Sequence, residues 1–244
     1  MTETTTILEI NSKDLVTYLS NSLDYVNTKS IGILNSIYIS EAFIAASEGS
    51  KLILTQLGPT DSTSNNYVLL DSKDVAVFNT TLKALNKLDK KGFKVLLSKV
   101  ENTVAFKVFD CFKEVKLTYN AIDSLKAFSY TDIKAPNYSQ CLIEDKKVLG
   151  IFKKSSLLKS LNAFRDKNAI VTINRNFPDT IDFDESTKEV NFYVKDLLTL
   201  LKTSTQEGIL LYTHEEGERV LKSPVFIEQD NITAMIMPVI KNND

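Results

Sequence analysis

The chain has 244 residues, more than a typical single domain and enough for two domains of ordinary size. Hydrophobic residues make up 43% and charged residues 25%, which excludes a disordered or fibrous chain and indicates a folded protein. The 29 Lys and Arg residues are balanced by 31 Asp and Glu residues, so the molecule as a whole is not a basic, phosphate-coating protein. Any contact with nucleic acid has to come from local segregation of charge.

The residues that carry most enzyme and metal chemistry are scarce in this sequence. Cys111 and Cys141 are the two cysteines, and their wide spacing favours reduced thiols over a disulfide framework or a zinc site. His214 is the sole histidine and stands among polar residues, which is typical of a surface position. We therefore expect no metal, no cofactor and no catalytic residue.

The N-terminal stretch MTETTTILEI has neither the basic region nor the apolar region of an export signal. No apolar run elsewhere in the sequence is long enough to span a bilayer. We therefore expect a cytoplasmic protein without a membrane partner.

The first half of the chain predicts strands interrupted by two helices. Leu15, Leu19 and Val26 share one face of the first helix, and alternating apolar residues indicate the strands. In chain order we expect a strand from Thr5 to Ile10, a helix from Ser12 to Val26, strands from Ile33 to Ile39, Ala42 to Ala46 and Lys51 to Leu57, an extended segment from Tyr67 to Phe78, a helix from about Asn79 that ends at Gly92, and strands from Phe93 to Leu97, Val104 to Phe109 and Val115 to Tyr119.

The second half repeats this order after an interruption at Pro136, Asn137 and Tyr138. The pattern predicts an α+β duplication of two domains, residues 1–140 and 141–244, each with two helices on one face of antiparallel sheet. The expected elements are an extended segment from Cys141 to Phe152, a helix from about Lys154 to Arg165, strands from Ala169 to Ile173, Thr180 to Phe183 and Val190 to Tyr193, a helix from about Lys195 to Ser204, and strands from Ile209 to Tyr212, Val220 to Ile227 and Thr233 to Ile240.

Cationic residues recur on the polar faces of three of these helices. In the second helix they are spaced i, i+4 and i+7, opposite an expected buried stripe of Leu82, Leu85 and Leu88. A solvated helix face is the simpler interpretation of each stripe alone, whereas the repeated sign favours a surface that neutralises phosphates without reading bases. The candidate positions are Lys83, Lys87, Lys90, Lys154, Lys159, Arg165, Lys195 and Lys202.

Several motifs resemble the DNA polymerase sliding clamps of bacterial type. Three match the last domain of that family, with its N-V-x-Y-L-L-x-A-L-like helix, S-P-V-x-I strand and terminal M-P-[ML]-R-L: VNFYVKDLLTLLKTST (190–205), LKSPVFIE (221–228) and AMIMPVI (234–240). Two weaker ones, ASEGSKL (46–52) and APNYSQCL (135–142), are similar to the family's middle domain. All occur in the family's order.

The resemblance implies a ring of similar domains, with sheets outside and helices lining a hole that encloses duplex DNA. The cationic positions would then face the hole. Bacterial clamps carry three such domains per chain and close as dimers, so a two-domain chain needs three copies, joined head to tail, for the same circumference. The implied function is that of a processivity factor without enzymatic activity. The implied partners are duplex DNA of any sequence, a replicative DNA polymerase, a clamp loader and further copies of this chain.

The resemblance also implies a pocket between the two domains that binds short linear peptides of the polymerase and the clamp loader. Met and Pro side chains would give this pocket an apolar, adaptable lining. The plain interpretation of its leucines and methionines is that they belong to the core. The matching positions are Leu34, Ser47, Gly49, Leu52, Pro224, Met235, Met237, Pro238 and Val239.

Ile240 and Lys51 depart from the family pattern, because each stands where the family usually has Arg. The peptide preference is therefore expected to differ. The two-domain form, on a chain rich in Lys and Asn, suggests a phage or other mobile-element origin, with a bacterial cell or an infected host cell as the setting.

Two other functions stay open on the sequence. One is a clamp-like protein that binds replication partners without encircling DNA. The other is an enzyme of nucleic-acid metabolism, whose mark would be a cleft with clustered carboxylates or a metal.

Overall fold

The structure is a computed structural model in which residues 4–30, 32–58, 66–101, 103–109, 114–120, 146–178, 180–215, 220 and 223–240 are described. Some predictions lie outside these residues. They concern both cysteines, the interruption at Pro136 to Tyr138, the 135–142 motif, residues 141–145 of an extended segment, and part of the 221–228 motif.

The chain forms two compact units. Unit 1 comprises Met1–Gly49 and Ile53–Tyr138, and unit 2 comprises Ser50–Leu52 and Ser139–Asp244. Unit 2 thus draws one short segment from the first half of the sequence.

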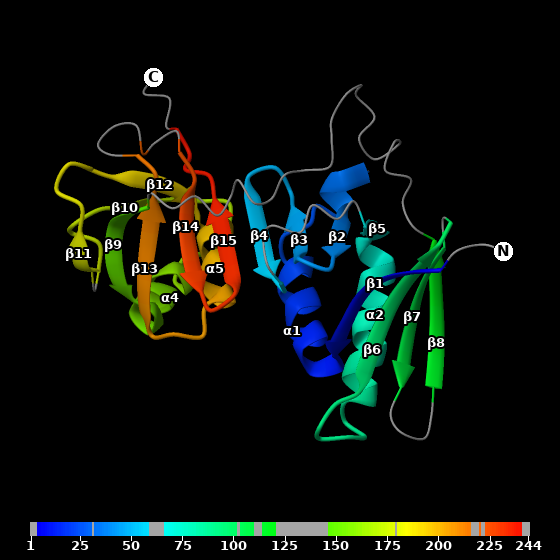
Figure 1. The fold of residues 1–244 in the computed structure, drawn as a ribbon. Helices are drawn as coiled ribbons and strands as arrows, with labels where there is room; N and C mark the ends of the chain where they lie inside the picture. The colour runs from blue at the N-terminus through cyan, green and yellow to red at the C-terminus, as the bar shows by residue number, and fades with distance from the viewer. Residues whose placement is uncertain are drawn as a thin grey trace. The chain divides into compact units, whose positions relative to one another are not determined.

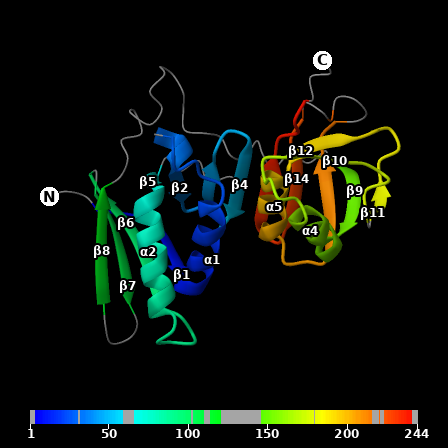
Figure 2. The same cartoon turned by 180° about the vertical axis from the view of Figure 1, so that it is seen from behind.

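Among its described residues, unit 1 has two antiparallel sheets and two α-helices that run side by side (Figures 1 and 2). One sheet has the strand order β1-β6-β7-β8, and the other contains β4, β3, β2 and β5 in that order. The elements are β1 (Thr5–Asn11), α1 (Ser12–Leu23), a short 3-10 helix η1 (Gly32–Asn35), β2 (Ser36–Ser40), β3 (Phe43–Ser47), β4 (Lys51–Gln56), β5 (Tyr67–Asp71), α2 (Ser72–Leu85), β6 (Lys94–Val100), β7 (Thr103–Phe109) and β8 (Glu114–Asn120). The first two residues of β4 belong to unit 2.

An aromatic cluster fixes α2 to the first of these sheets. Phe78 of α2 stacks on Phe106 of β7 with ring centroids 3.9 Å apart, and Tyr119 of β8 meets both rings edge-on. Burial raises the pKa of Tyr119, and the nearby carboxylate of Asp74 raises it further. Because burying one aromatic side chain contributes about 1.5–3 kcal/mol, this contact holds the helix on the sheet.

The start of α2 differs from the sequence-based prediction, which has an extended segment to Phe78. Asp71 is the N-cap, and its carboxylate accepts a hydrogen bond of 2.8 Å from the backbone N–H of Lys73. The helix therefore begins at Ser72 and ends at Leu85, so the predicted end at Gly92 is also wrong. Leu88, predicted to be buried, lies beyond the helix and is 80% exposed.

The cap gives a test of this helix start. We expect Asp71→Ala to destabilise unit 1 by about 1 kcal/mol, because it removes the acceptor for an N-terminal N–H of α2. Thr81→Ala, inside the helix, is the control and should change stability by less than about 0.5 kcal/mol. Urea unfolding followed by circular dichroism compares the two variants. Equal effects would contradict the assignment of the cap.

Unit 2 has a main sheet with helices on one face. The described strands follow the order β11-β9-β13-β14-β15, and β10 pairs with β12 in a separate two-stranded sheet. The helices lie behind the main sheet in Figure 1 and in front of it in Figure 2. The elements are β9 (Lys147–Lys153), α4 (Lys154–Asn162), β10 (Ile170–Ile173), β11 (Thr180–Phe183), β12 (Val190–Tyr193), α5 (Val194–Thr203), β13 (Gly208–Thr213), β14 (Val225–Gln229) and β15 (Ile232–Ile236).

The helices of unit 2 follow the predicted pattern closely. α5 buries Val194, Leu197 and Leu201 as its apolar spacing requires. α4 ends at Asn162 and not at Arg165, and β15 ends at Ile236 and not at Ile240. The predicted fold class, α+β with two helices on antiparallel sheet in each half, is confirmed.

Candidate functional site

The cationic positions of unit 1 lie at one end of α2. Lys83 is exposed in the last helical turn, and Lys87 and Lys90 are exposed in the turn Asn86–Phe93 that follows. The outer face of α2 itself is less basic than predicted, because it also presents Val77 and Thr80 to solvent. The three predicted lysines therefore gather at a helix end and do not form one stripe along the helix.

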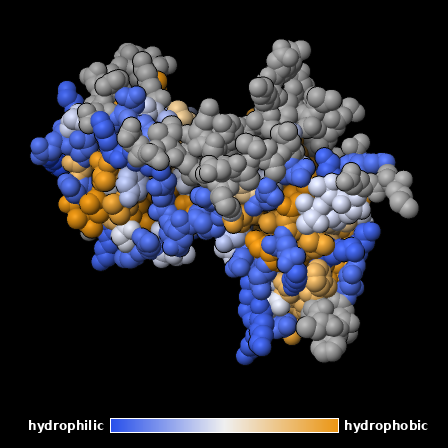
Figure 3. Space-filling view, in the orientation of Figure 1, coloured by the Kyte–Doolittle hydropathy of each residue, from blue (hydrophilic) through white to orange (hydrophobic). Residues whose placement is uncertain are grey.

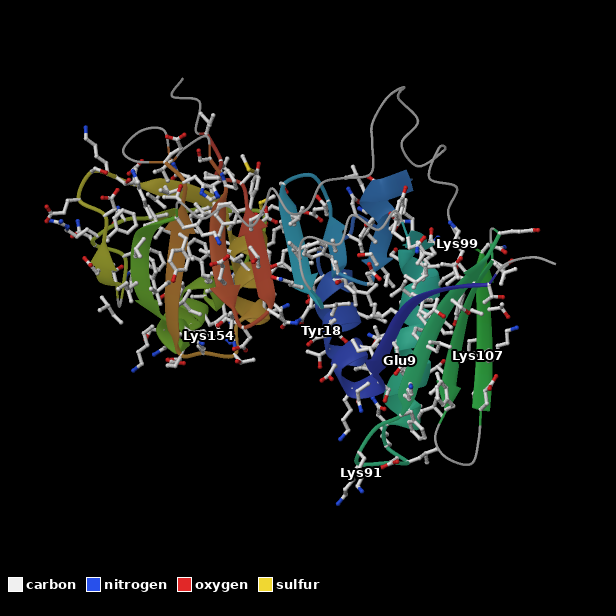
Figure 4. The ribbon with its side chains drawn as sticks, in the orientation of Figure 1. Glu9, Tyr18, Lys91, Lys99, Lys107 and Lys154 are labelled. Carbon is white, nitrogen blue, oxygen red and sulfur yellow. The ribbon has the colours of Figure 1, made fainter. Side chains whose placement is uncertain are left out.

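The cationic positions of unit 2 differ in whether contacts within the unit already hold their side chains. Lys154, at the start of α4 (Figure 4), is half-buried and its ammonium donates a hydrogen bond to the carbonyl of Ser204. Lys195 lies over the ring of Tyr193, 5.4 Å from its centroid. The remaining positions, Lys159, Arg165 and Lys202, are exposed. Lys154 thus has a structural role inside the unit whatever else it does.

The residues predicted to bind peptides include two methionines on one face of the β15 segment. Ala234 and Ile236 are fully buried, whereas Met235 and Met237 alternate with them and are half-buried. Strand side chains alternate between faces, and the exposure of Met235 and Met237 follows this alternation past the end of β15, which favours the same side for both thioethers. The flexible, polarisable thioether suits contact with varied apolar partners.

Backbone hydrogen bonds position the segment after β15. Met237 donates its N–H to the carbonyl of Ser50 (2.8 Å), and Val239 donates to the carbonyl of Asn191 (2.7 Å). Ser50 belongs to unit 2, as does Leu52, which is buried. The structure thus joins parts of two predicted motifs, ASEGSKL and AMIMPVI, within one unit.

Neighbouring strands complete an apolar face beside Met235. Phe226 of β14 is its cross-strand partner, and Tyr212 of β13 pairs with Phe226 in turn. His214, predicted to be a plain surface residue, packs edge-on against Phe226 with ring centroids 4.6 Å apart. Pro224 precedes β14 and is half-buried, as is Pro238. The sequence motifs gave no signal for His214 or Tyr212, because only strand pairing brings them here.

The other predicted peptide-binding positions, Leu34, Ser47 and Gly49, lie in unit 1. Leu34 and Ser47 are half-buried, and the hydroxyl of Ser47 accepts a hydrogen bond from the N–H of Gly49 (3.2 Å). Gly49 has a φ of 97°, a left-handed conformation that favours glycine. The sequence E-G-S is therefore suited to this turn, and a binding role for its residues stays a prediction.

A buried ion pair holds the Ser50–Leu52 segment within unit 2. Lys51 Nζ lies 3.7 Å from Asp196 Oδ1, and the two side chains are only 8% and 3% exposed. Asp196 stands in the first turn of α5, where the helix dipole favours a negative charge. This pair fixes the segment whose carbonyl receives the N–H of Met237.

We expect Lys51→Met to destabilise unit 2 by about 3–5 kcal/mol, because the Asp196 carboxylate would stay buried without its cation. The double variant Lys51→Met with Asp196→Leu should recover most of this loss. Calorimetric unfolding of the three proteins measures the effect. A single variant as stable as the unaltered chain would contradict the role assigned to the pair.

Within the described residues, no three His, Cys, Asp or Glu side chains are grouped so that they could hold a metal ion. In the same residues, no helix combines the length and apolar character needed to cross a membrane.

Comparison with known proteins identifies the fold. No protein-family model and no curated protein matches the chain. Solved structures of bacterial DNA polymerase sliding clamps match it over nearly its whole length, so the chain has the sliding-clamp fold. It spans about two thirds of the length of these clamps.

Three matches illustrate the likeness. The clamp of Caulobacter crescentus is 14% identical with a TM-score of 0.71, and the match covers 99% of this chain and 68% of the clamp. The ligand-bound clamp of Pseudomonas aeruginosa is 13% identical with a TM-score of 0.71, and the match covers 99% of this chain and 68% of the clamp. The Helicobacter pylori clamp bound to a DNA ligase peptide is 14% identical with a TM-score of 0.66, and the match covers 99% of this chain and 67% of the clamp. At such identities the likeness establishes the fold alone.

Proposed function

We propose that this chain is a sliding clamp, a processivity factor that encircles duplex DNA and holds a replicative DNA polymerase on it in the cytoplasm. The observation that carries the proposal is the clamp fold over 99% of the chain. The processivity role requires no catalytic chemistry, because a closed ring keeps its partner at a high effective concentration on DNA.

The ring is proposed to consist of three copies joined head to tail, since each chain spans about two thirds of a bacterial clamp. Edge strands offer the means of joining. Within the described residues, β8 bonds only to β7 and β11 only to β9, so each leaves one backbone edge for another chain. Val115 on β8 and Ile181 on β11 are exposed apolar residues on these edges. Figure 3 shows apolar surface over the β9 and β11 region. Light scattering coupled to gel filtration measures the number of copies.

Encirclement has a topological test. The clamp, loaded onto nicked circular DNA by its loader, should stay bound in high salt and leave when the circle is linearised. A protein that keeps the peptide site but does not enclose DNA would dissociate equally from both forms. That second result would favour the clamp-like interaction protein and overturn the proposal.

The cationic positions give a test of DNA contact. We expect Lys83→Glu with Lys87→Glu to lower loading about tenfold or more, because two attractive phosphate contacts become repulsive. Lys29→Glu with Lys188→Glu changes the net charge equally at exposed sites away from the helices and is the control. Loading is measured as protein retained on nicked circles. Equal effects of the two variants would contradict a specific role for Lys83 and Lys87.

Peptide binding is proposed for the face formed by Leu52, Pro224, Met235, Met237, Pro238 and Val239, with Leu34, Ser47 and Gly49 as further positions. A Helicobacter pylori clamp binds a DNA ligase peptide, which supports a site for replication and repair partners of this chain. The half-buried methionines supply an apolar surface without exposing a large patch. The peptides are proposed to be segments of the polymerase and of the clamp loader.

We expect Met237→Asp to weaken binding of a labelled ligase-derived peptide at least about tenfold, which corresponds to about 1.4 kcal/mol of lost apolar contact. Ile240→Asp is the matched control, because Ile240 is exposed and close in the sequence. Fluorescence polarisation measures both. If the control loses as much affinity as Met237→Asp, the assignment of the site is wrong.

A further inference from the structure

The turn Asn86–Phe93 of unit 1, here called the basic turn, gathers more cations than the sequence motifs indicated. Lys13, at the start of α1, joins the lysines at the end of α2, and Lys91 projects from the tip of the turn (Figure 4). The acids in these segments are Asp14 and Asp89. The lysines of the basic turn and its surroundings are Lys13, Lys83, Lys87, Lys90 and Lys91. In a chain of net charge −2 this is a marked local excess of positive charge.

Hydrogen bonds from the start of α1 hold the basic turn in place. Ser12, fully buried, donates its hydroxyl to Asn86 Oδ1 and accepts the N–H of Phe93 (2.8 Å). Its own N–H donates to the carbonyl of Phe93 (2.8 Å). Both ends of the turn are therefore bound to one residue.

Hydrogen bonds at the middle of the basic turn also hold it in place. Asn11 Nδ2 donates to the carbonyl of Lys91 (3.3 Å), and the ammonium of Lys13 donates to the carbonyl of Lys90. Gly92 has a φ of 80°, and a Cβ there would lie 2.7 Å from Asn11 Oδ1. The close approach of the turn to α1 thus depends on glycine.

The corresponding turn of unit 2 has the same anchor and a different charge. Lys154 donates its N–H to the carbonyl of Glu207 (2.7 Å), as Ser12 does to Phe93. The turn Ser204–Glu207 is shorter and contains no lysine. Ser155 donates its hydroxyl and its N–H to the Glu207 carboxylate, which holds the pKa of Glu207 below its usual range. The turn itself is therefore cationic only in unit 1, whereas the lysines of unit 2 flank its turn at Lys153, Lys154 and Lys202.

We propose that the basic turn is a preformed phosphate-contact element, in which Lys13 and Lys91 bind duplex DNA together with Lys87 and Lys90, and which Ser12 and Asn11 position. A turn held before binding loses less conformational entropy when it meets the phosphates than a mobile one would. The ammonium of Lys13 keeps N–H groups beyond the one given to Lys90. The inference rests on the proposed function, since it names the residues that contact the DNA inside the clamp.

The test measures binding of the full chain to a short fluorescent DNA duplex by anisotropy, over a series of salt concentrations and without a loader. We expect Lys13→Ala with Lys91→Ala to reduce the slope of log affinity against log salt by about 0.9 for each lost contact. Lys153→Ala, an exposed lysine beside the unit 2 turn, should leave the slope unchanged. Equal slopes for the double variant and the unaltered chain would overturn the inference, as would binding that does not depend on salt.

Ser12→Ala separates positioning from charge. It keeps every lysine, and we expect it to weaken DNA binding several-fold while circular dichroism stays unchanged. Asn11→Ala is the second variant if Ser12→Ala fails to fold. Unchanged affinity in the folded variant would refute the positioning role. Retention on circular DNA is measured separately. If the chain is not retained on closed circles but shows the expected salt slopes, the proposed function is wrong and the phosphate contact is still supported.

Discussion

Each unit depends on one constraint, the burial of one face of two helices against antiparallel sheet. In unit 1, the stacked rings of Phe78 and Phe106 join α2 to β7, and in unit 2 the fully buried Leu197 and Leu201 hold α5. Because these contacts occupy one face of each helix, the opposite faces and the helix ends are left for polar residues. The backbone bond from the start of the first helix to the turn after the second helix occurs in both units. Within each unit, this bond holds the start of the first helix beside the turn that follows the second helix, so side chains from the two segments lie close together.

This constraint explains which parts of the fold the sequence could predict. Strands such as β11 and β12 and the helix α5 show clean alternation or helical spacing, and their predicted ranges agree with the structure to within a residue. The start of α2 was missed because Val68, Leu69 and Leu70 lead directly into the helix, and Asp71 alone marks the cap. Leu88 continues the spacing of Leu82 and Leu85, yet the helix has already ended. The spacing of apolar residues in the sequence cannot show where the packing of a helix against the rest of the fold ends.

The candidate site shows the same limit more strongly. Motif resemblance selected Met235 and Met237, and their alternation with buried neighbours fits an apolar face. The hydrogen bond from Met237 to Ser50 joins residues far apart in the chain, so no periodicity could predict it. The same holds for His214, which reaches Phe226 only because β13 pairs with β14. Likewise, Lys13 and Lys90 meet through a turn whose conformation depends on Gly92.

The distribution of charge is consistent with the proposed ring that moves along DNA. In the proposed ring, topology would prevent escape, so strong phosphate binding would add little retention and would oppose sliding. A chain with balanced overall charge that collects lysines at one turn would meet both needs of the proposed ring, because the proposed contact is local and salt-sensitive. The unit 2 turn carries Glu207 at the equivalent anchor and contains no lysine. Rigid presentation of a few cations would therefore serve the proposed ring better than a uniformly basic surface, since it would guide the duplex without holding it in one register.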